Sequence, residues 1–211
     1  MQEYNKIETV FERDVNGTKK MMPGKFRNKT VEYLANNSWL FTEKIDGTNI
    51  RVHWDGHKVE FGGRTDKAQI PSTLVAYLMA AFGGNGSEEL FEQKFGENEV
   101  ILFGEGYGAG IQKGGLYRDD VSFILFDVMI GGVYLERENV EEIAKTFGVD
   151  VVPIIGIGTI DEAVEIVMSN PKSTIGSAPM EGIVARPVVE IKDRMGHRVI
   201  TKIKCCDFAT R

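Results

Sequence analysis

The chain has 211 residues, of which 42% are hydrophobic and 27% charged, a composition that is ordinary for a globular protein and argues against disorder. This length suits one well-packed domain and is short for two. The formal net charge of -6 excludes the strongly basic surface expected of a protein whose main task is to grip phosphate backbones.

The apolar stretches and the cysteines indicate the cellular setting. No apolar run approaches the roughly 18–20 residues of a membrane span, and the N-terminal stretch lacks the apolar centre of a signal peptide. Cys205 and Cys206 are adjacent, so they cannot form a disulfide framework. We interpret them as strand residues that face opposite sides of a sheet, and we expect a reducing, cytoplasmic location.

The first half of the chain predicts strands followed by helices. Apolar, β-leaning stretches predict strands over residues 39–45, 48–54 and 55–63, with Asp-Gly turn chemistry between them. The period then becomes helical over residues 72–84 and 87–96, and the second helix is expected to begin at Ser87 as N-cap. The predicted apolar face of the first helix consists of Leu74, Val75, Leu78, Met79 and Phe82.

The second half predicts a similar mixture. Buried strands are expected over residues 98–108 and 121–132, and amphipathic helices follow over residues 137–148 and 159–170. Two more strands, over residues 180–188 and 198–208, end the chain. Sheet segments joined by both hairpins and helices predict an α+β fold of antiparallel sheets, in a single domain that covers residues 1–211.

Several common sites are absent from the sequence. There is no G-x-x-x-x-G-K-[ST] phosphate loop, and "GEGYGAGIQKGG" does not fit the dinucleotide pattern G-x-G-x-x-G. The three histidines have no spacing to the cysteines that suits zinc. The adjacent cysteines also lack the C-x-x-C spacing of a redox pair.

Charged residues inside apolar strands are the positive signal. Glu105, Asp127 and Glu181 lie in or beside strands whose apolar residues are expected to be buried. Lys202 and Lys204 are two residues apart, which places both on one strand face. Each residue alone is most simply a solvated position or a structural ion pair. Together, buried charges of both signs indicate a polar site lined by strands.

The residue types in this site suit nucleotide chemistry. Lys44, in "EKIDGTN", is a candidate nucleophile, because an uncharged lysine attacks well when cationic neighbours or metals favour that form. Glu105 and Glu181 can hold a divalent metal, and Phe126 can stack on a base. These parts predict attack by a lysine on the α-phosphate of a nucleotide.

Five motifs in a fixed order carry a resemblance to a known superfamily. They are Lys44-Ile45-Asp46-Gly47, Glu105, Phe126-Asp127, Glu181-Gly182 and Lys202-Ile203-Lys204. This order resembles the covalent nucleotidyltransferases, which include polynucleotide ligases and RNA capping enzymes. Asn49 stands where DNA ligases and capping enzymes usually carry arginine, so the chain looks most like the phage RNA ligases of the nick-sealing type. The resemblance implies a nucleotidyltransferase (adenylyltransferase) domain of antiparallel sheets with flanking helices, ATP-grasp/DNA-ligase-like.

The resemblance also implies a role for each motif. Lys44 would form a covalent lysyl-AMP, and Lys202 and Lys204 would hold the α-phosphate and orient Lys44. Glu181 would bind Mg2+ or Mn2+. Glu43 and Asp46 would also bind the nucleotide. Asn49 and Arg64 would contact the phosphate, and Glu105 would bind the ribose or a metal. Phe126 would stack on the adenine, with Asp127 beside it. Arg64 could also engage the 5'-phosphate end of the RNA.

The implied activity is that of an ATP-dependent RNA ligase. Lys44 attacks ATP, AMP passes to an RNA 5'-phosphate, and a 3'-hydroxyl then displaces AMP.

Relatives commonly carry a C-terminal OB or helical domain, and we expect none within residues 1–211. The alternatives are a DNA ligase, a GTP-using capping guanylyltransferase, or a nucleotide- or RNA-binding module whose catalysis has decayed. The sequence leaves open whether the RNA is a nicked duplex or a single strand. The basic stretch from Lys19 to Lys29 is either an RNA contact or a solvated loop.

Overall fold

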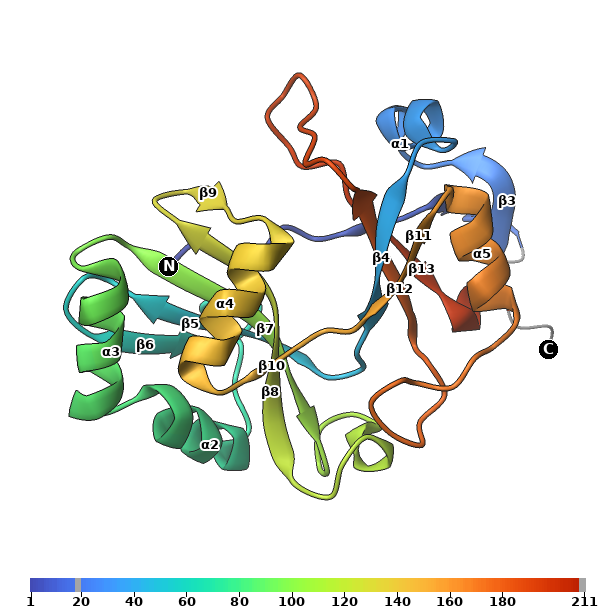
Figure 1. Ribbon diagram of the computed structural model, residues 1–211. Helices are drawn as coiled ribbons and strands as arrows, with labels where there is room; N and C mark the ends of the chain where they lie inside the picture. Colours follow the sequence, from blue (N-terminus) through green and yellow to red (C-terminus); the bar gives the residue numbers. More distant parts are fainter. Residues whose placement is uncertain (18–19, 209–211) are drawn as a thin grey trace. The chain divides into compact units, whose positions relative to one another are not determined.

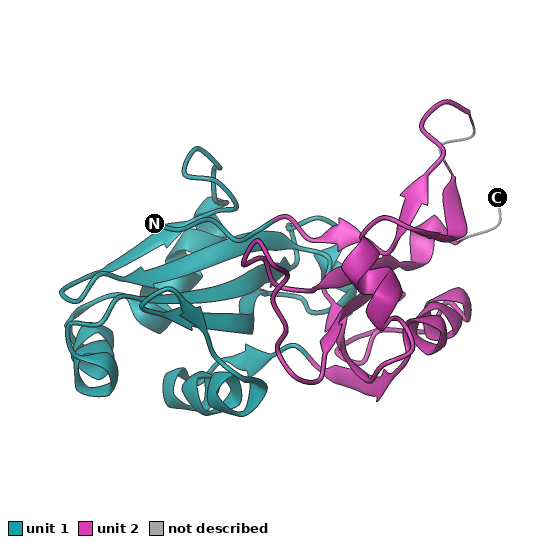
Figure 2. Ribbon diagram, turned by 90° about the horizontal axis from the view of Figure 1, so that it is seen from above, with its two compact units in different colours: residues 1–5, 46–152 teal, residues 6–45, 153–211 magenta. Residues whose placement is uncertain are grey.

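The structure is a computed structural model that describes residues 1–17 and 20–208, and it divides into two units (Figure 2). Unit 1 comprises Met1–Asn5 and Asp46–Val152, and unit 2 comprises Lys6–Ile45 and Pro153–Arg211. The chain passes from unit 2 to unit 1 between Ile45 and Asp46, inside the predicted Asp-Gly turn. Lys19, the first residue of the basic stretch, lies outside the described residues.

Unit 1 is built on a six-stranded sheet (Figure 1). Its strands, in spatial order, are β10 (Asp150–Val151), β8 (Val121–Ile130), β7 (Val100–Gly108), β5 (Thr48–Trp54) and β6 (Val59–Gly62), with β9 (Val133–Tyr134) on β8. All pairs are antiparallel except β10 with β8. The β-branched and aromatic residues in these segments favour strands, and successive side chains point to opposite faces of the sheet.

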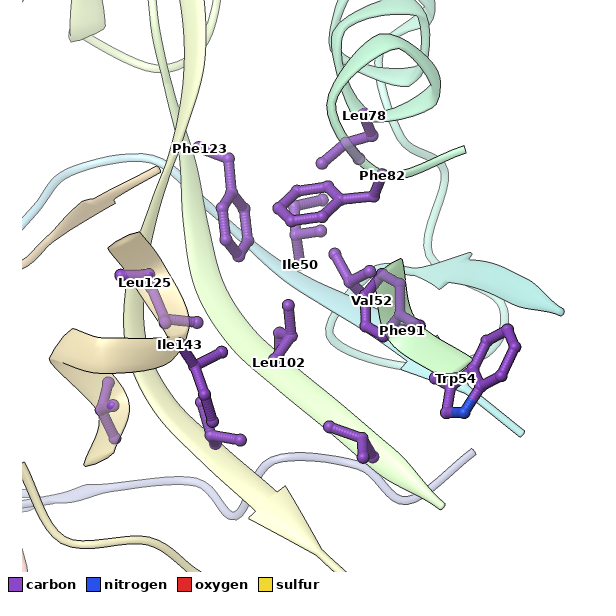
Figure 3. Close-up of a cluster of buried hydrophobic side chains, with 14 of the residues drawn as sticks. Ile50, Val52, Trp54, Leu78, Phe82, Phe91, Leu102, Phe123, Leu125 and Ile143 are labelled. Carbon is purple, nitrogen blue, oxygen red and sulfur yellow. The ribbon is translucent and has the colours of Figure 1, made fainter. Parts of the chain in front are cut away.

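Helices cover one face of this sheet and form the larger core with it (Figure 3). They are α2 (Ser72–Phe82), α3 (Asn85–Phe95) and α4 (Arg137–Phe147), and a short 3-10 turn, η1, spans Gly114–Leu116. Leu78 and Phe82 of α2 and Phe91 of α3 are fully buried against Ile50 and Leu102 of the sheet. Gly148 ends α4 in the left-handed conformation, with φ of 65°, which glycine adopts without steric cost.

The other face of the same sheet carries a small apolar cluster and a β-bulge. The N-terminal residues Met1 and Tyr4 pack there with Phe103 and Phe126. Phe103 pairs with Asp127, and Gly104 pairs with Leu125, so β8 contains one extra residue, Phe126, relative to β7. A bulge of this kind interrupts the alternation of side chains along the strand.

Unit 2 contains a five-stranded sheet and a small two-stranded one (Figure 1). The larger has the order β1 (Glu8–Thr9), β13 (Thr201–Lys204), β12 (Gly182–Pro187), β4 (Trp39–Lys44) and β11 (Ile154–Gly158), and the smaller pairs β2 (Phe11–Arg13) with β3 (Met21–Phe26). The remaining elements are α1 (Lys29–Leu34), α5 (Ile160–Met168) and the 3-10 turn η2 (Cys205–Asp207). A capping box at Thr159 and Glu162 begins α5, which packs Ile160, Ala163 and Val167 into the core of the unit.

The predicted α+β fold of antiparallel sheets is confirmed except at two parallel pairs, β1 with β13 and β10 with β8. Some local predictions are wrong. The second helix begins at Asn85 with Gly84 as N-cap, so Ser87 lies inside it. Val75 and Met79 of α2 are 36% and 51% exposed, because the helix buries a narrower stripe than its apolar residues suggested. Cys205 and Cys206 are free and lie in η2 instead of a strand.

The Asp-Gly turn also connects strands differently from a hairpin. β4 belongs to the five-stranded sheet and β5 to the six-stranded sheet. Turn chemistry marks where a strand ends but does not specify the strand with which it pairs. Among the described residues, no helix is long and apolar enough to cross a membrane.

Candidate active site

In unit 2, the predicted nucleophile Lys44 lies in a short chain of charged groups. Lys44 Nζ donates to Glu181 Oε2 at 2.7 Å, and Lys204 Nζ lies 2.8 Å from Glu181 Oε1. One carboxylate therefore holds two lysines, one on each oxygen. All three side chains are partly exposed, with 16–29% of each side chain accessible, so a ligand in solvent can reach them.

The strand register explains this arrangement. Gly182 of β12 stands opposite Lys44 of β4 on one side and Lys204 of β13 on the other. Opposite residues project from the same face of a sheet, and Gly182 has no side chain between the two lysines. A Cβ atom at this position would overlap the carbonyl oxygen of Ile203. The Glu-Gly pair thus places a carboxylate at the start of β12 and allows the backbone of β13 to approach closely beside it.

Lys202 and Lys204 share one face of β13, as the spacing predicted. Ile203, which lies between the two lysines, and Thr201, which precedes them, are buried. Burial by itself would lower the pKa of Lys204, but the hydrogen bond and charge of Glu181 outweigh this effect and raise that pKa. Lys204 is therefore held in its charged form, which suits a group that binds phosphate oxygens.

Glu43 has a different environment from its neighbour Lys44. Its side chain is 1% exposed, and its Oε2 accepts hydrogen bonds from Thr174 N at 2.9 Å and Thr174 Oγ1 at 2.5 Å. Successive strand residues face opposite sides, so the Glu43 carboxylate lies on the face of β4 that carries the buried Phe41. The other oxygen, Oε1, has no partner among the described residues.

Thr174 belongs to a loop that leads directly to Glu181. The loop is closed at its base by hydrogen bonds from Met180 N to Pro171 O and from Ser173 N to Ala178 O, both 2.9 Å. Glu43 therefore anchors the loop that directly precedes Glu181 in the sequence. The nucleotide-binding role expected of Glu43 stays a prediction, and the contact that the structure gives its carboxylate is structural.

The turn after Lys44 is packed tightly against β7 of unit 1. The backbone N–H of Asp46 donates to the hydroxyl of Tyr117 at 3.3 Å. A Cβ atom at Gly47 would lie 2.8 Å from Glu105 Cγ and would overlap the carbonyl oxygen of Gly106. The glycine of the K-x-D-G motif is thus required by the close approach of a second strand.

We expect Gly47→Ala to lower the stability of the protein by about 1–3 kcal/mol, because the added methyl group forces the turn and β7 apart. Thermal unfolding followed by circular dichroism measures this change. Gly86→Ala is the matched control: Gly86 lies in α3 with nothing within 4 Å of an added Cβ. That change should be neutral or stabilise the helix by up to about 1 kcal/mol. Equal melting temperatures for the two variants would contradict the packing argument.

In unit 1, four predicted nucleotide-binding residues share the face of the sheet that the helices leave uncovered. Ile50 and Val52 of β5 point into the helical core, so alternation places Asn49 on the other face. Glu105 pairs with Asn49 in the β5–β7 register. Asn49 Oδ1 is buried without a partner among the described residues, which leaves an acceptor available to a ligand.

The bulge in β8 brings Phe126 and Asp127 to this same face. Leu125 and Val128 on either side of the pair are in the helical core. Phe126 packs edge-on against the ring of Tyr4, with centroids 5.0 Å apart, and Tyr4 Oη donates to Asp127 Oδ2 at 2.6 Å. Because one tyrosine contacts both residues, the structure brings the Phe-Asp motif together on one surface.

Arg64 lies in an exposed segment directly after β6. Within the described part of the chain its guanidinium has no hydrogen bond or ion pair, in contrast to Arg51, which is fully buried and bonded to the same segment. The sequence interpretation overlooked Arg51, Tyr4 and Thr174. The signal that could have identified Arg51 is a charged residue inside an apolar strand, here between Ile50 and Val52. The same kind of signal identified Asp127.

Comparison with known proteins identifies the family. The model of the RNA ligase family matches residues 37–204, a range that includes all of β4 and ends at Lys204. The chain belongs to this family. A comparison with curated protein sequences gave no match.

Solved structures show the same fold. A variant of the Naegleria gruberi RNA ligase without ligand superposes with a TM-score of 0.68 at 17% identity, over 99% of this chain and 57% of that chain. A variant of the same enzyme with ATP and Mn has a TM-score of 0.63 at 19% identity, over 83% of this chain and 51% of that one. A further variant, with AMP and Mn, has a TM-score of 0.67 at 17% identity, over 97% and 56%. The chain thus spans little more than half the length of these enzymes.

Proposed function

We propose that the protein is an ATP-dependent RNA ligase, whose residues 1–211 form one nucleotidyltransferase (adenylyltransferase) domain. The observation that carries this proposal is the Lys44–Glu181–Lys204 chain, in which the lysine of the K-x-D-G motif is held at 2.7 Å by a carboxylate that a second lysine also holds. The family match runs through both units. That range includes all five motifs that predicted the reaction.

The residues of unit 2 perform the bond-forming steps. Lys44 is a nucleophile only as the neutral amine, so it gives up its proton and its bond to Glu181 before it attacks. Lys204 remains on the other oxygen of Glu181 and keeps that carboxylate in place. Lys202 and Lys204 offer two ammonium groups on one strand face, where they bind the α-phosphate and stabilise the charge that develops during transfer.

The residues of unit 1 bind the nucleotide. Phe126 offers an aromatic face for adenine, and Asp127 is fixed beside it by the Tyr4 hydroxyl. Glu105 and Asn49 offer acceptors for the ribose or for the water around a phosphate. The unpaired buried oxygen of Asn49 supports this assignment. Asp46 and Arg64, the latter exposed, complete the set of nucleotide-binding residues.

The carboxylates Glu105 and Glu181 suit a divalent metal. Mg2+ is commonly bound by one or two carboxylates together with substrate phosphates and water. The described residues contain no group of three or more histidine, cysteine, aspartate or glutamate side chains that could hold a metal by themselves. When bound, Mg2+ or Mn2+ neutralises part of the triphosphate charge. The relatives solved with ATP and Mn and with AMP and Mn support this assignment.

The reaction has three steps, and each exchanges one bond at phosphorus. The Lys44 amine forms a bond to the α-phosphorus of ATP while pyrophosphate leaves, and the amine loses a proton. An RNA 5'-phosphate oxygen then displaces Lys44, which yields AMP linked to the RNA end. Finally, a 3'-hydroxyl attacks that 5'-phosphate, loses its proton, and AMP departs. Positioning and charge stabilisation account for most of such catalysis.

Incubation with ATP labelled at its α-phosphate tests the proposal. In the presence of Mg2+ or Mn2+ we expect label to remain on the denatured protein, and to pass from it to RNA that carries a 5'-phosphate. No label on the protein would overturn the proposal. Label from GTP but not from ATP would indicate a capping enzyme, and transfer to DNA ends but not to RNA ends would indicate a DNA ligase.

A further inference from the structure

Arg51 is a charged residue of unit 1 that is 0% exposed and is bonded through three of its nitrogen atoms. Its Nε donates to the carbonyl oxygen of Gly63 at 2.7 Å, and its Nη2 donates to Asp66 Oδ1 at 2.8 Å. Its Nη1 donates to the carbonyl oxygen of Met1 at 3.0 Å. Burial of a cation is costly without such partners, so this side chain determines where the three acceptors lie.

Two of these acceptors lie on either side of Arg64 in the sequence. Gly63 is the residue directly before Arg64, and Asp66 is two residues after it. One guanidinium therefore fixes the backbone on both sides of an exposed arginine. The planar fork of arginine bonds in several fixed directions at once, which lysine cannot reproduce.

The surrounding sequence leaves space for this arrangement. Gly62 stands opposite Arg51 in the β5–β6 register, and a Cβ atom there would lie 3.0 Å from Arg51 Nη2 and 3.1 Å from Met1 Sδ. The segment then folds back, with Ala68 N donating to Thr65 O at 3.0 Å. Asp66 is bonded to Arg51 although its own side chain is 71% exposed, so the tether extends from the buried guanidinium to the surface.

We propose that Arg51 is a positioning residue that presets Arg64 for a phosphate group of the nucleotide or of the RNA end. Arg51 itself touches neither substrate. It acts through the carbonyl group of Gly63 and the carboxylate of Asp66, which fix the backbone from which the exposed side chain of Arg64 projects before the phosphate arrives. This inference rests on the proposed ligase function, in which Arg64 binds a phosphate.

A double-mutant cycle tests whether Arg51 acts through Arg64. The rates to be measured are those of protein labelling by ATP and of label transfer to 5'-phosphorylated RNA. In whichever step Arg64→Ala slows, we expect Arg51→Met to slow the same step by about 10- to 100-fold, the range caused by small misplacement of a binding group. In the Arg64→Ala background, Arg51→Met should cause no further loss, because the group that it positions is already gone.

Two further variants separate positioning from folding. Asp66→Asn changes a surface side chain and preserves the buried guanidinium, so the variant should remain folded, and it too should slow the reaction only when Arg64 is present. His53→Gln is the matched control, since His53 is a buried polar residue two positions along the same strand, bonded to Glu99 at 2.8 Å. If His53→Gln slows the reaction, the fold-change should multiply with that of Arg64→Ala in the double variant, because the two residues act independently. Thermal unfolding identifies variants that lose their fold.

The outcomes distinguish this inference from the proposed function. If the wild-type protein takes no label, the ligase proposal fails and this inference fails with it. If the wild type is labelled but Arg64→Ala changes neither rate, or if the losses from Asp66→Asn and Arg64→Ala multiply, the ligase proposal stands and the positioning role of Arg51 is wrong.

Discussion

Lys44→Ala is expected to reduce labelling of the protein by ATP to the background level, because the amine proposed to form the covalent bond to AMP is removed. Lys44→Arg should give the same result. Arginine keeps a positive charge beside Glu181 but stays protonated at any working pH. The measurement is the amount of label retained on the denatured protein after incubation with ATP and a divalent metal.

The control for this prediction is Lys58→Ala. Lys58 is a surface lysine whose contact is an ion pair with Glu60 at 2.6 Å, and its removal should leave labelling unchanged. Label that remains on Lys44→Arg at the wild-type level would show that another residue is the nucleophile. Peptide mapping of the labelled protein would then identify it.

Glu181→Gln is expected to reduce the rate of labelling by about 100-fold, the magnitude typical of losing one charged group from a preorganised site. The carboxylate accepts from Lys44 on one oxygen and from Lys204 on the other, whereas an amide has only one acceptor oxygen. The substitution also lowers the pKa of Lys204, because burial, which lowers this pKa, is then no longer outweighed by the charge of Glu181. An NMR titration of the lysine side chains measures this second effect.

Glu60→Gln is the matched control for Glu181→Gln. Glu60 also pairs with a lysine, but it lies on the edge strand β6 and belongs to none of the five motifs, so its loss should not change the rate of labelling. A rate for Glu181→Gln within a few-fold of the wild type would contradict the proposed role of this carboxylate. The pKa of Lys204 would then show whether the ion pair itself had been broken.

The sequence predicts those parts of the fold whose pattern is local. β5 and the two strands of the central hairpin, β7 and β8, lie where alternation and turn residues indicated them, and α4 ends at Gly148 as expected. The pairing of β4 with β12 joins residues about 140 positions apart in the chain, and no local signal encodes it. The same limit applies to the split of the chain into two sheets at the Asp-Gly turn, since that turn resembles the turn of a simple hairpin.

The candidate site is predictable to the extent that its residues interrupt apolar patterns. Asp127 and the Lys202/Lys204 pair were recognised in this way, and the structure gives each a defined place on a sheet face. The contact of Glu43 with Thr174 could not be predicted, because it joins a strand to a loop with no motif of its own. The tether from Arg51 to the Arg64 segment depends on a tight turn after β6 that the sequence indicates only through its glycines.

The extra residue in β8 makes this strand sensitive to changes in length as well as in chemistry. If either Phe126 or Asp127 were deleted, β8 could pair with β7 in an uninterrupted ladder, and such a change would relieve a distortion in the sheet. The same deletion would nevertheless remove a side chain to which the proposed function assigns nucleotide binding, and it would shift the remaining partner of Tyr4 along the ladder. The deletion of one residue at this point should therefore be tolerated by folding but should impair the proposed function, the reverse of the usual expectation for the middle of a buried strand.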